Sequence, residues 1–169
     1  MTIRYRDGRP GDGAAISDLF CEAFTATFGH IYAEEDLASF LCELHPDAFE
    51  SELANPDYAF RLAHDGETLA GYIKLGPDML PIEKPDKCWE IYQLYLAADY
   101  KGKGIAQCLM DWGLDEARAR GFSHAQLTVY IDNHRARRFY EKYGFEEVGQ
   151  YSFMVGNHED DDRIMRLAL

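Results

Sequence analysis

The chain has 169 residues and a formal net charge of −13, because 30 Asp and Glu outnumber 17 Lys and Arg. Hydrophobic residues make up 47% of it and aromatic residues 14%, which suffices for a packed core in one domain, residues 1–169. The negative charge disfavours nucleic acid as a partner, since binding it requires neutralised phosphates. No apolar run approaches the roughly 18 residues of a membrane span, so we expect no membrane partner.

The N-terminus runs straight into charged residues and lacks the apolar stretch of a secretory signal, which indicates a cytoplasmic protein. The cysteines lie far apart, form no C-x-x-C pair and have no histidine at ligand spacing. We therefore expect reduced, mostly buried thiols and neither a disulfide framework nor a metal site. The cysteines are Cys21, Cys42, Cys88 and Cys108.

The first third of the chain predicts one strand and three helices. Residues 2–5 are expected to form an edge strand, and apolar residues at helical spacing predict a helix over 14–28 with Asp12 as its cap. Two shorter helices are predicted over 34–44 and 46–54, the second opened by a proline.

The remainder alternates strands with helices, which is typical of an α/β fold. Asp65-Gly66 predicts a hairpin turn, and Gly121 and Gly144 are expected to end helices. The helix before Gly121 should bury a stripe of Ile105, Cys108, Leu109 and Trp112. The predicted elements are strands over 58–64, 68–75 and 89–96, a helix over 105–120, a strand over 125–131, a helix over 135–143, and strands over 145–154 and 163–169.

A glycine turn between a predicted strand and helix, Lys101-Gly102-Lys103-Gly104-Ile105-Ala106, directs backbone N–H groups and a positive helix end at one point. Such a point suits a phosphate. A dinucleotide-binding G-x-G-x-x-G would need glycine at position 107, which is Gln, and no Gly-Lys-Ser/Thr of a P-loop occurs. A connector without a ligand stays open as the plain alternative.

This turn resembles the acetyl-CoA pyrophosphate loop of the GNAT family of N-acetyltransferases, R/Q-x-x-G-x-G/A, with Lys101 in place of Arg or Gln. The preceding strand, residues 90–96, is similar to the family's central strand. Residues 133–145 are similar to its N-x-x-A-x-x-x-Y-E-K-x-G-F segment. The flanks, residues 23–28 and 151–156, resemble bacterial spermidine/spermine N-acetyltransferases.

The resemblance implies a GNAT α/β fold, a twisted mixed sheet of about six to seven strands with helices on both faces. It implies an enzyme that takes acetyl-CoA as cosubstrate and transfers the acetyl group directly to a primary amine of a small molecule, with a polyamine favoured. No metal is required. Acetylation of a protein N-terminus or lysine is one alternative, and a non-catalytic acetyl-CoA-binding module is another. Many relatives form homodimers, so a homodimer is possible.

The resemblance also assigns site residues. Tyr140 would protonate the departing thiolate, although an aromatic packed on the sheet would look the same. Glu90 is the first choice as proton acceptor through water, with a salt-bridged strand residue as the alternative. Cofactor binding falls to Leu94, Tyr95, Leu96, Lys101, Gly102, Lys103, Gly104, Ile105, Ala106, Asn133, Arg138, Tyr140 and Lys142. Substrate binding falls to Glu90, Tyr92, His30 and Tyr32.

Charge is unevenly distributed along the chain. Basic residues of the turn and of the helix over 135–143 could meet the phosphates of CoA, while the acidic remainder could attract a cationic amine. Asn133 suits either contact with the pantetheine arm or an ordinary helix cap. The run Glu159-Asp160-Asp161-Asp162 is predicted to be a solvated turn, with amine recruitment as the minor alternative.

Overall fold

A computed structural model describes residues 1–169, which form a seven-stranded mixed sheet flanked by five α-helices. The helices are α1 (Gly13–Phe28), α2 (Glu34–Glu43), α3 (Pro46–Leu53), α4 (Ile105–Ala119) and α5 (His134–Tyr143). The strands are β1 (Ile3–Asp7), β2 (Ala59–Asp65), β3 (Thr68–Pro77), β4 (Cys88–Leu96), β5 (His124–Tyr130), β6 (Glu146–Val155) and β7 (His158–Ala168). None of the helices is both long and apolar enough to cross a bilayer.

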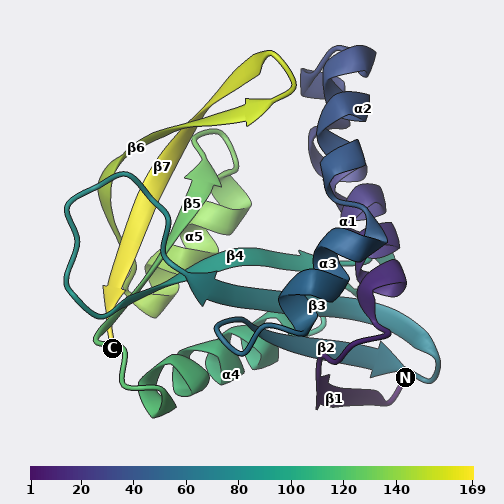
Figure 1. Ribbon diagram of the computed structural model, residues 1–169, viewed down its shortest axis with the longest axis horizontal. Helices are drawn as coiled ribbons and strands as arrows, with labels where there is room; N and C mark the ends of the chain where they lie inside the picture. Colours follow the sequence, from purple (N-terminus) through teal and green to yellow (C-terminus); the bar gives the residue numbers. More distant parts are fainter.

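The sheet has the order β1-β2-β3-β4-β5-β7-β6 and divides into two arms (Figure 1). Antiparallel pairing joins β1 to β4 in one arm and β5, β7 and β6 in the other. The arms meet through the parallel pair β4–β5, whose register covers only Cys88, Trp89 and Glu90 on the β4 side. Beyond these residues the two strands diverge, and the sheet opens.

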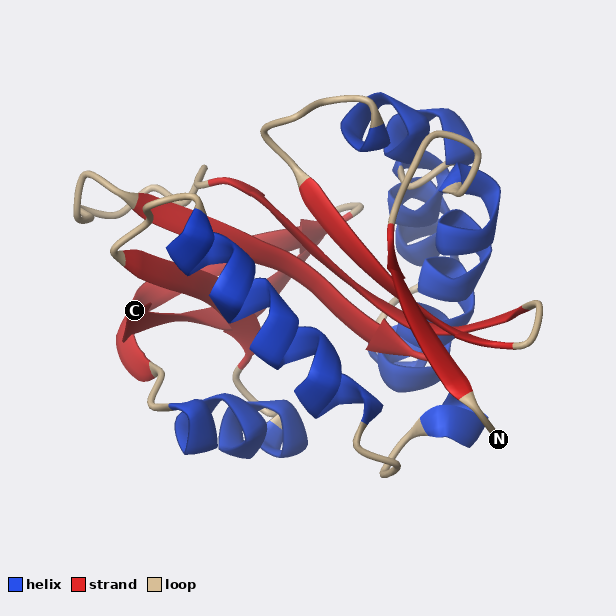
Figure 2. Ribbon diagram, turned by 90° about the horizontal axis from the view of Figure 1, so that it is seen from below, coloured by secondary structure: helices blue, strands red, loops and turns tan.

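Helices cover both faces of the sheet (Figure 2), which confirms the expected α/β fold. One core cluster packs the buried stripe of α4 against β3, β4 and β5, with α5 at its border. The second packs α1 and α3 against the opposite face of β2 and β3. Successive side chains of β3 point to opposite faces of the sheet and so contribute to both core clusters: Tyr72 faces α1, and Ile73 faces α4.

Three local expectations are wrong. The Asp12 carboxylate does not cap α1, because it pairs with Arg6 at 2.7 Å, and Glu50 of α3 accepts from the N–H of Gly13 instead. Cys108 is exposed, since the buried stripe of α4 runs through Leu109 and Met110. Among the four cysteines only Cys88 is buried.

The acidic run at 159–162 is the largest correction. It is not a solvated turn, because β7 begins at His158 and includes it. Asp160 and Asp162 are buried, with exposed fractions of 4% and 6%, whereas Glu159 and Asp161 point outward. The other predicted elements differ from the structure by no more than two residues at either end.

Candidate active site

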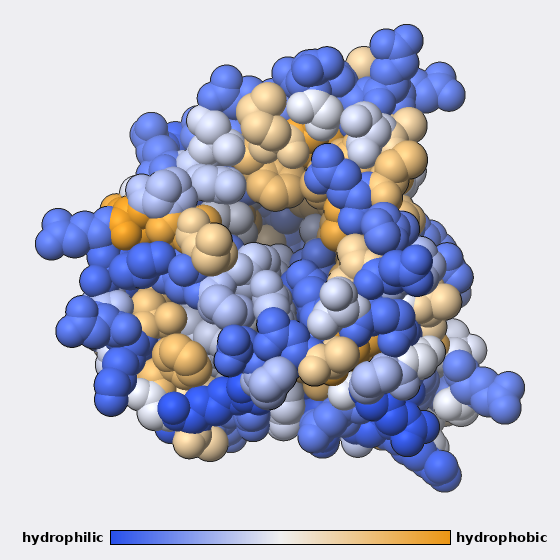
Figure 3. Space-filling model, viewed as in Figure 1, coloured by the Kyte–Doolittle hydropathy of each residue, from blue (hydrophilic) through white to orange (hydrophobic).

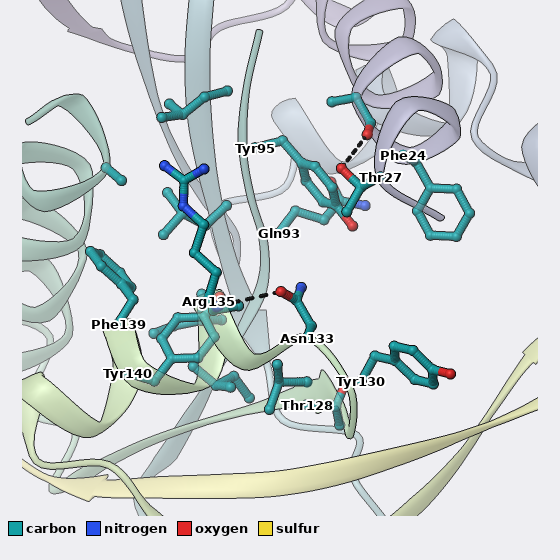
Figure 4. Close-up of a pocket in the computed structure, with 18 of the residues that line it drawn as sticks. Phe24, Thr27, Gln93, Tyr95, Thr128, Tyr130, Asn133, Arg135, Phe139 and Tyr140 are labelled. Carbon is teal, nitrogen blue, oxygen red and sulfur yellow. Dashed lines mark hydrogen bonds between the residues drawn. The ribbon is translucent and has the colours of Figure 1, made fainter. Parts of the chain in front are cut away.

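A cleft of about 870 Å³ lies where the sheet opens, between α1 and α5 and above β4. The space-filling view shows the molecule hollowed at this point (Figure 3). Side chains from α1, β4, β5 and α5 face this space (Figure 4). The cleft therefore brings together residues that lie far apart in the sequence.

The wall formed by β4 carries unpaired backbone groups. Ala97 N–H donates to Ala70 O at 2.9 Å, so the alternation of an antiparallel ladder directs the main-chain groups of Leu94 and Leu96 away from β3. They face the side where β5 has already diverged. The main chain of Tyr95 instead belongs to the ladder with β3. Leu94 and Leu96 thus offer N–H and C=O groups to a ligand in the cleft.

The glycine turn forms one end of the cleft. Gly102 and Gly104 have φ of +77° and +81°, which favours glycine, and a Cβ on either would meet no atom of the chain within 4 Å. Cys108 N–H is the first amide of α4 with a helical partner, Gly104 O. The three preceding amides, those of Ile105, Ala106 and Gln107, are therefore free to bind an anion.

Cations from two elements border the same end. Lys101 of the turn and Arg135, Arg138 and Lys142 of α5 line the cleft. Lys103 does not line it, because its ammonium lies over the Tyr100 ring, 5.4 Å from the centroid. The Ile105 side chain is buried in the core, so only its main chain can serve the turn.

Asn133 and Tyr140 lie between the turn and the rest of the cleft. The Asn133 side chain accepts from Ala136 N–H at 3.3 Å, so it caps α5, and its amide nitrogen is left as a donor. Burial raises the pKa of Tyr140 to about 12. Its hydroxyl therefore stays protonated near neutral pH and can donate to a thiolate.

The opposite end of the cleft is aromatic. Phe24 stacks on Tyr32 with ring centroids 5.9 Å apart, and Phe28 meets Tyr130 edge-on at 6.2 Å. Phe40 of α2 packs on Phe153 of β6 at 5.6 Å, and Asn157 N–H donates to Asp36 at 2.9 Å. These contacts join the tip of the β6–β7 hairpin to α2, which lies beside it in Figure 1. We call the end of the cleft bordered by this junction the closed end. Tyr32 and Tyr92 both line the cleft, and their role in substrate binding stays a prediction.

Asp160 and Asp162 also line this end, and sequence reasoning missed them as site residues. The Tyr32 hydroxyl donates to Asp160. Burial and the neighbouring Asp160 raise the pKa of Asp162 to about 7, and a hydrogen bond from the Thr128 hydroxyl partly opposes that rise. Residues 159–162 have no apolar alternation that would place them in a strand, and only the structure shows that 160 and 162 are buried while 159 and 161 are exposed.

Glu90 and His30 do not line the cleft. The Glu90 carboxylate accepts from Met79 N–H at 3.0 Å beneath the loop after β3, and burial raises its pKa to about 7. Tyr92, which lines the cleft and donates to Pro77 O, lies next to it. Because Glu90 does not itself line the cleft, its role as proton acceptor stays a prediction.

These features fit a molecule of the shape and charge of acetyl-CoA. Free amides and cations at the turn suit its phosphates, and the unpaired groups of Leu94 and Leu96 suit the amides of its pantetheine arm. The thioester would then lie between Tyr140 and the aromatic end, where an acceptor can approach. The cleft thus has the arrangement of a site for acyl transfer from a CoA thioester.

Residues 14–145 match the model of the acetyltransferase (GNAT) family. An uncharacterized N-acetyltransferase of Mycobacterium tuberculosis is 36% identical over 156 residues, which cover 91% of this chain and 96% of that protein. The chain belongs to the GNAT family of N-acetyltransferases, and the predicted enzyme class is confirmed.

Solved structures agree on the fold. The PaiA N-acetyltransferase from Thermoplasma acidophilum, in complex with coenzyme A, has a TM-score of 0.80 and 24% identity over 100% of both chains. Mutant forms of the spermidine/spermine N-acetyltransferase SpeG from Vibrio cholerae have a TM-score of 0.67 and 20% identity, covering 99% of this chain and 95% of that one. At these identities the likeness supports the fold and does not identify the acceptor.

Proposed function

We propose that the protein transfers the acetyl group of acetyl-CoA to a primary amine of a small, cationic molecule such as a polyamine. The observation that carries the proposal is the junction of α2 and the β6–β7 hairpin at the acceptor end of the cleft. Asp36 and Phe40 of α2 hold Asn157 and Phe153 of the hairpin, and this junction restricts the room for an extended peptide. A flexible amine of small cross-section fits such a space better than a protein terminus.

The chain supplies positioning and charge, and the bound thioester supplies the acetyl group. The main-chain N–H of Leu94 would hold the carbonyl oxygen while negative charge develops on it. Tyr140 would give its proton to the departing sulfur. The turn at 101–106 and the cations of α5 would hold the phosphates, which fixes the reacting end by its distance from them. Transfer would be direct, within one ternary complex.

The proposal is tested by thiol release from acetyl-CoA with a panel of spermidine, spermine, aminoglycosides, α-amino acids and basic peptides. We expect turnover on the free polyamines and little on peptides. Turnover confined to peptides would contradict the small-molecule proposal and favour protein acetylation. Acetyl-CoA binding in calorimetry without turnover on any amine would instead favour a non-catalytic binding module.

A further inference from the structure

Two carboxylates of β7 face the closed end of the cleft. Asp160 and Asp162 occupy alternate positions of one strand, so both side chains project to the same face. Asp162 is paired in register with Tyr130 of β5 and Tyr151 of β6, which places it inside the arm of the sheet and not at its edge. Carboxylates this deeply buried are costly unless a cation or hydrogen bonds compensate them.

The chain leaves part of this charge uncompensated. One oxygen of Asp160 accepts from the Tyr32 hydroxyl, but Oδ1 is buried and has no hydrogen-bond partner. His158 Nε2 lies 3.3 Å from Oδ1 without a hydrogen bond, so it compensates the carboxylate only when the imidazole is protonated. An unpaired carboxylate oxygen that borders a cleft calls for a donor from a ligand.

The surroundings favour a positively charged donor. Tyr32 and Tyr130 offer aromatic rings beside the two carboxylates, and ring faces attract cations. Lys74, the basic residue on the wall of β3, is neutralised by Glu52, whose two oxygens lie 2.7 and 2.9 Å from its ammonium. The positive charge of Lys74 is therefore compensated within the chain.

We propose that the acceptor enters the cleft as an ammonium ion bound by Asp160 and Asp162, and that Asp162 takes the proton the nitrogen must lose before it attacks. The inference rests on the proposed transfer to an amine. It assigns to β7 the proton-accepting role that sequence analysis gave to Glu90. It also sets specificity, because the carboxylate of an α-amino acid would lie beside two like charges.

The proton balance closes with Asp162, Tyr140 and water. One N–H bond of the ammonium breaks, its electron pair stays on nitrogen, and the proton moves to Asp162. As the new C–N bond forms and the C–S bond breaks, Tyr140 gives its proton to sulfur. Nitrogen then loses a second proton, which restores Tyr140. The proton on Asp162 passes to water, so each turnover releases one proton.

The ionisation of Asp162 suits this role. A carboxyl with a pKa of about 7 is available as a base near neutral pH, unlike an ordinary exposed Asp. The groups that act on it are Asp160, Asp161, Tyr32, Tyr95, Tyr130 and Thr128, and His158 lies beside Asp160. Burial raises the pKa of Tyr95, and Tyr140 and Asp162 raise it further. The proposed proton donor and the proposed proton acceptor therefore both lie near the Tyr95 ring.

Binding is measured first, by calorimetry of spermidine, putrescine and agmatine with the CoA-loaded enzyme. We expect Asp160→Asn and Asp162→Asn each to weaken amine binding by about 10-fold or more while CoA affinity stays unchanged. Asp161→Asn removes the same charge from the outer face of the same strand and should change amine binding less than about twofold. No amine binding by the wild type, or equal binding by all variants, would overturn the inference.

The pH profile of kcat/KM separates the two candidate bases. We expect the wild type and Glu90→Gln to share an ascending limb near pH 7, and Asp162→Asn to lose it. A limb that survives in Asp162→Asn and disappears in Glu90→Gln would overturn the assignment of the base. Amine binding that depends on Asp160, in an enzyme that acetylates none of the amines, would support the ammonium site and contradict the proposed transfer.

Discussion

The two ends of the cleft present charge of opposite sign on different kinds of group. The proposed cofactor end presents the free amides of the turn at 101–106 together with Lys101 and the cations of α5. The proposed acceptor end presents the buried carboxylates of Asp160 and Asp162 within aromatic walls. Main-chain groups offer fixed geometry for a ligand of fixed shape, whereas side chains on separate elements can vary with the acceptor. With this arrangement, the acceptor end can change in sequence while the cofactor end keeps its geometry.

The most severe way to break the cofactor end is Gly104→Glu. A side chain at this φ of +81° projects into the open space of the turn and brings a negative charge against phosphates. We expect CoA affinity to fall by about 100-fold or more in calorimetry. The matched control is Gly121→Glu, at a φ of +82° in equally open space beyond the other end of α4. Unchanged affinity in Gly104→Glu would refute the assignment of the turn.

Tyr140→Phe tests the junction between the two ends. Loss of the proton donor should lower kcat by about 10- to 100-fold, while the KM for acetyl-CoA changes little. Steady-state kinetics with a saturating amine measures both. Tyr151→Phe, outside the cleft lining, should leave both constants unchanged. An unaltered kcat in Tyr140→Phe would make Tyr140 a packing residue.

Arg135→Ala sharpens the electrostatic side of the comparison. Removing one cation from the cleft should weaken CoA binding by about 5- to 10-fold and reduce its dependence on salt. Arg137→Ala is the control on the same helix, because that guanidinium donates to Ile131 O away from the cleft. Equal losses in the two variants would indicate a general effect of net charge.

Asp162→Asn also tests the acceptor end without turnover. The folded-state pKa of about 7 lies above the ordinary 3.8, so the folded chain binds this proton more tightly than the unfolded chain. That stabilisation is present below pH 3.8 and is lost as the pH rises to about 7. Relative to the wild type, we expect the Tm of Asp162→Asn to gain about 5–10 °C between pH 5 and pH 8. Asp161→Asn should show a much smaller trend, because the Asp161 charge contributes least to the raised pKa of Asp162.

The smallest effect is expected where α2 meets the β6–β7 hairpin. Asp36→Ala removes the acceptor for Asn157 N–H and should loosen the closed end. We expect the KM for the amine to rise about two- to threefold and the KM for acetyl-CoA to stay the same. Glu35→Ala, an exposed acid of the same helix, is the control. A change in the KM for acetyl-CoA would show that the two ends are not independent.

The cofactor end could be predicted from sequence because its parts are local. The turn at 101–106 is contiguous, and Asn133 and Tyr140 belong to one short helix. The acceptor end could not, because its walls come from α1, α2 and β7. In β7, the residues that point inward at 160 and 162 line a cleft and not a core. They are therefore acidic, and the apolar alternation that marks a strand is missing there.

Glu90 illustrates a second limit. Its place on the central strand follows from the chain pattern, but its burial depends on the loop after β3, whose Met79 N–H binds the carboxylate. The cap of α1 has the same cause, since Glu50 of α3 takes the position that local sequence suggests for Asp12. Which of two distant carboxylates binds a given N–H group depends on tertiary packing, and a local sequence pattern does not predict it.

Because β4 and β5 diverge, hydrogen exchange at two peptide groups should depend on whether the cleft holds a ligand. The amides of Leu94 and Leu96 lie at an internal seam where the ladder has stopped, so without a ligand nothing in the chain protects them from hydrogen exchange. A bound pantetheine would act as a temporary strand, slow their exchange and couple the two arms mechanically. Exchange rates at these two positions would thus report saturation of the cleft in an enzyme that has been given no acceptor.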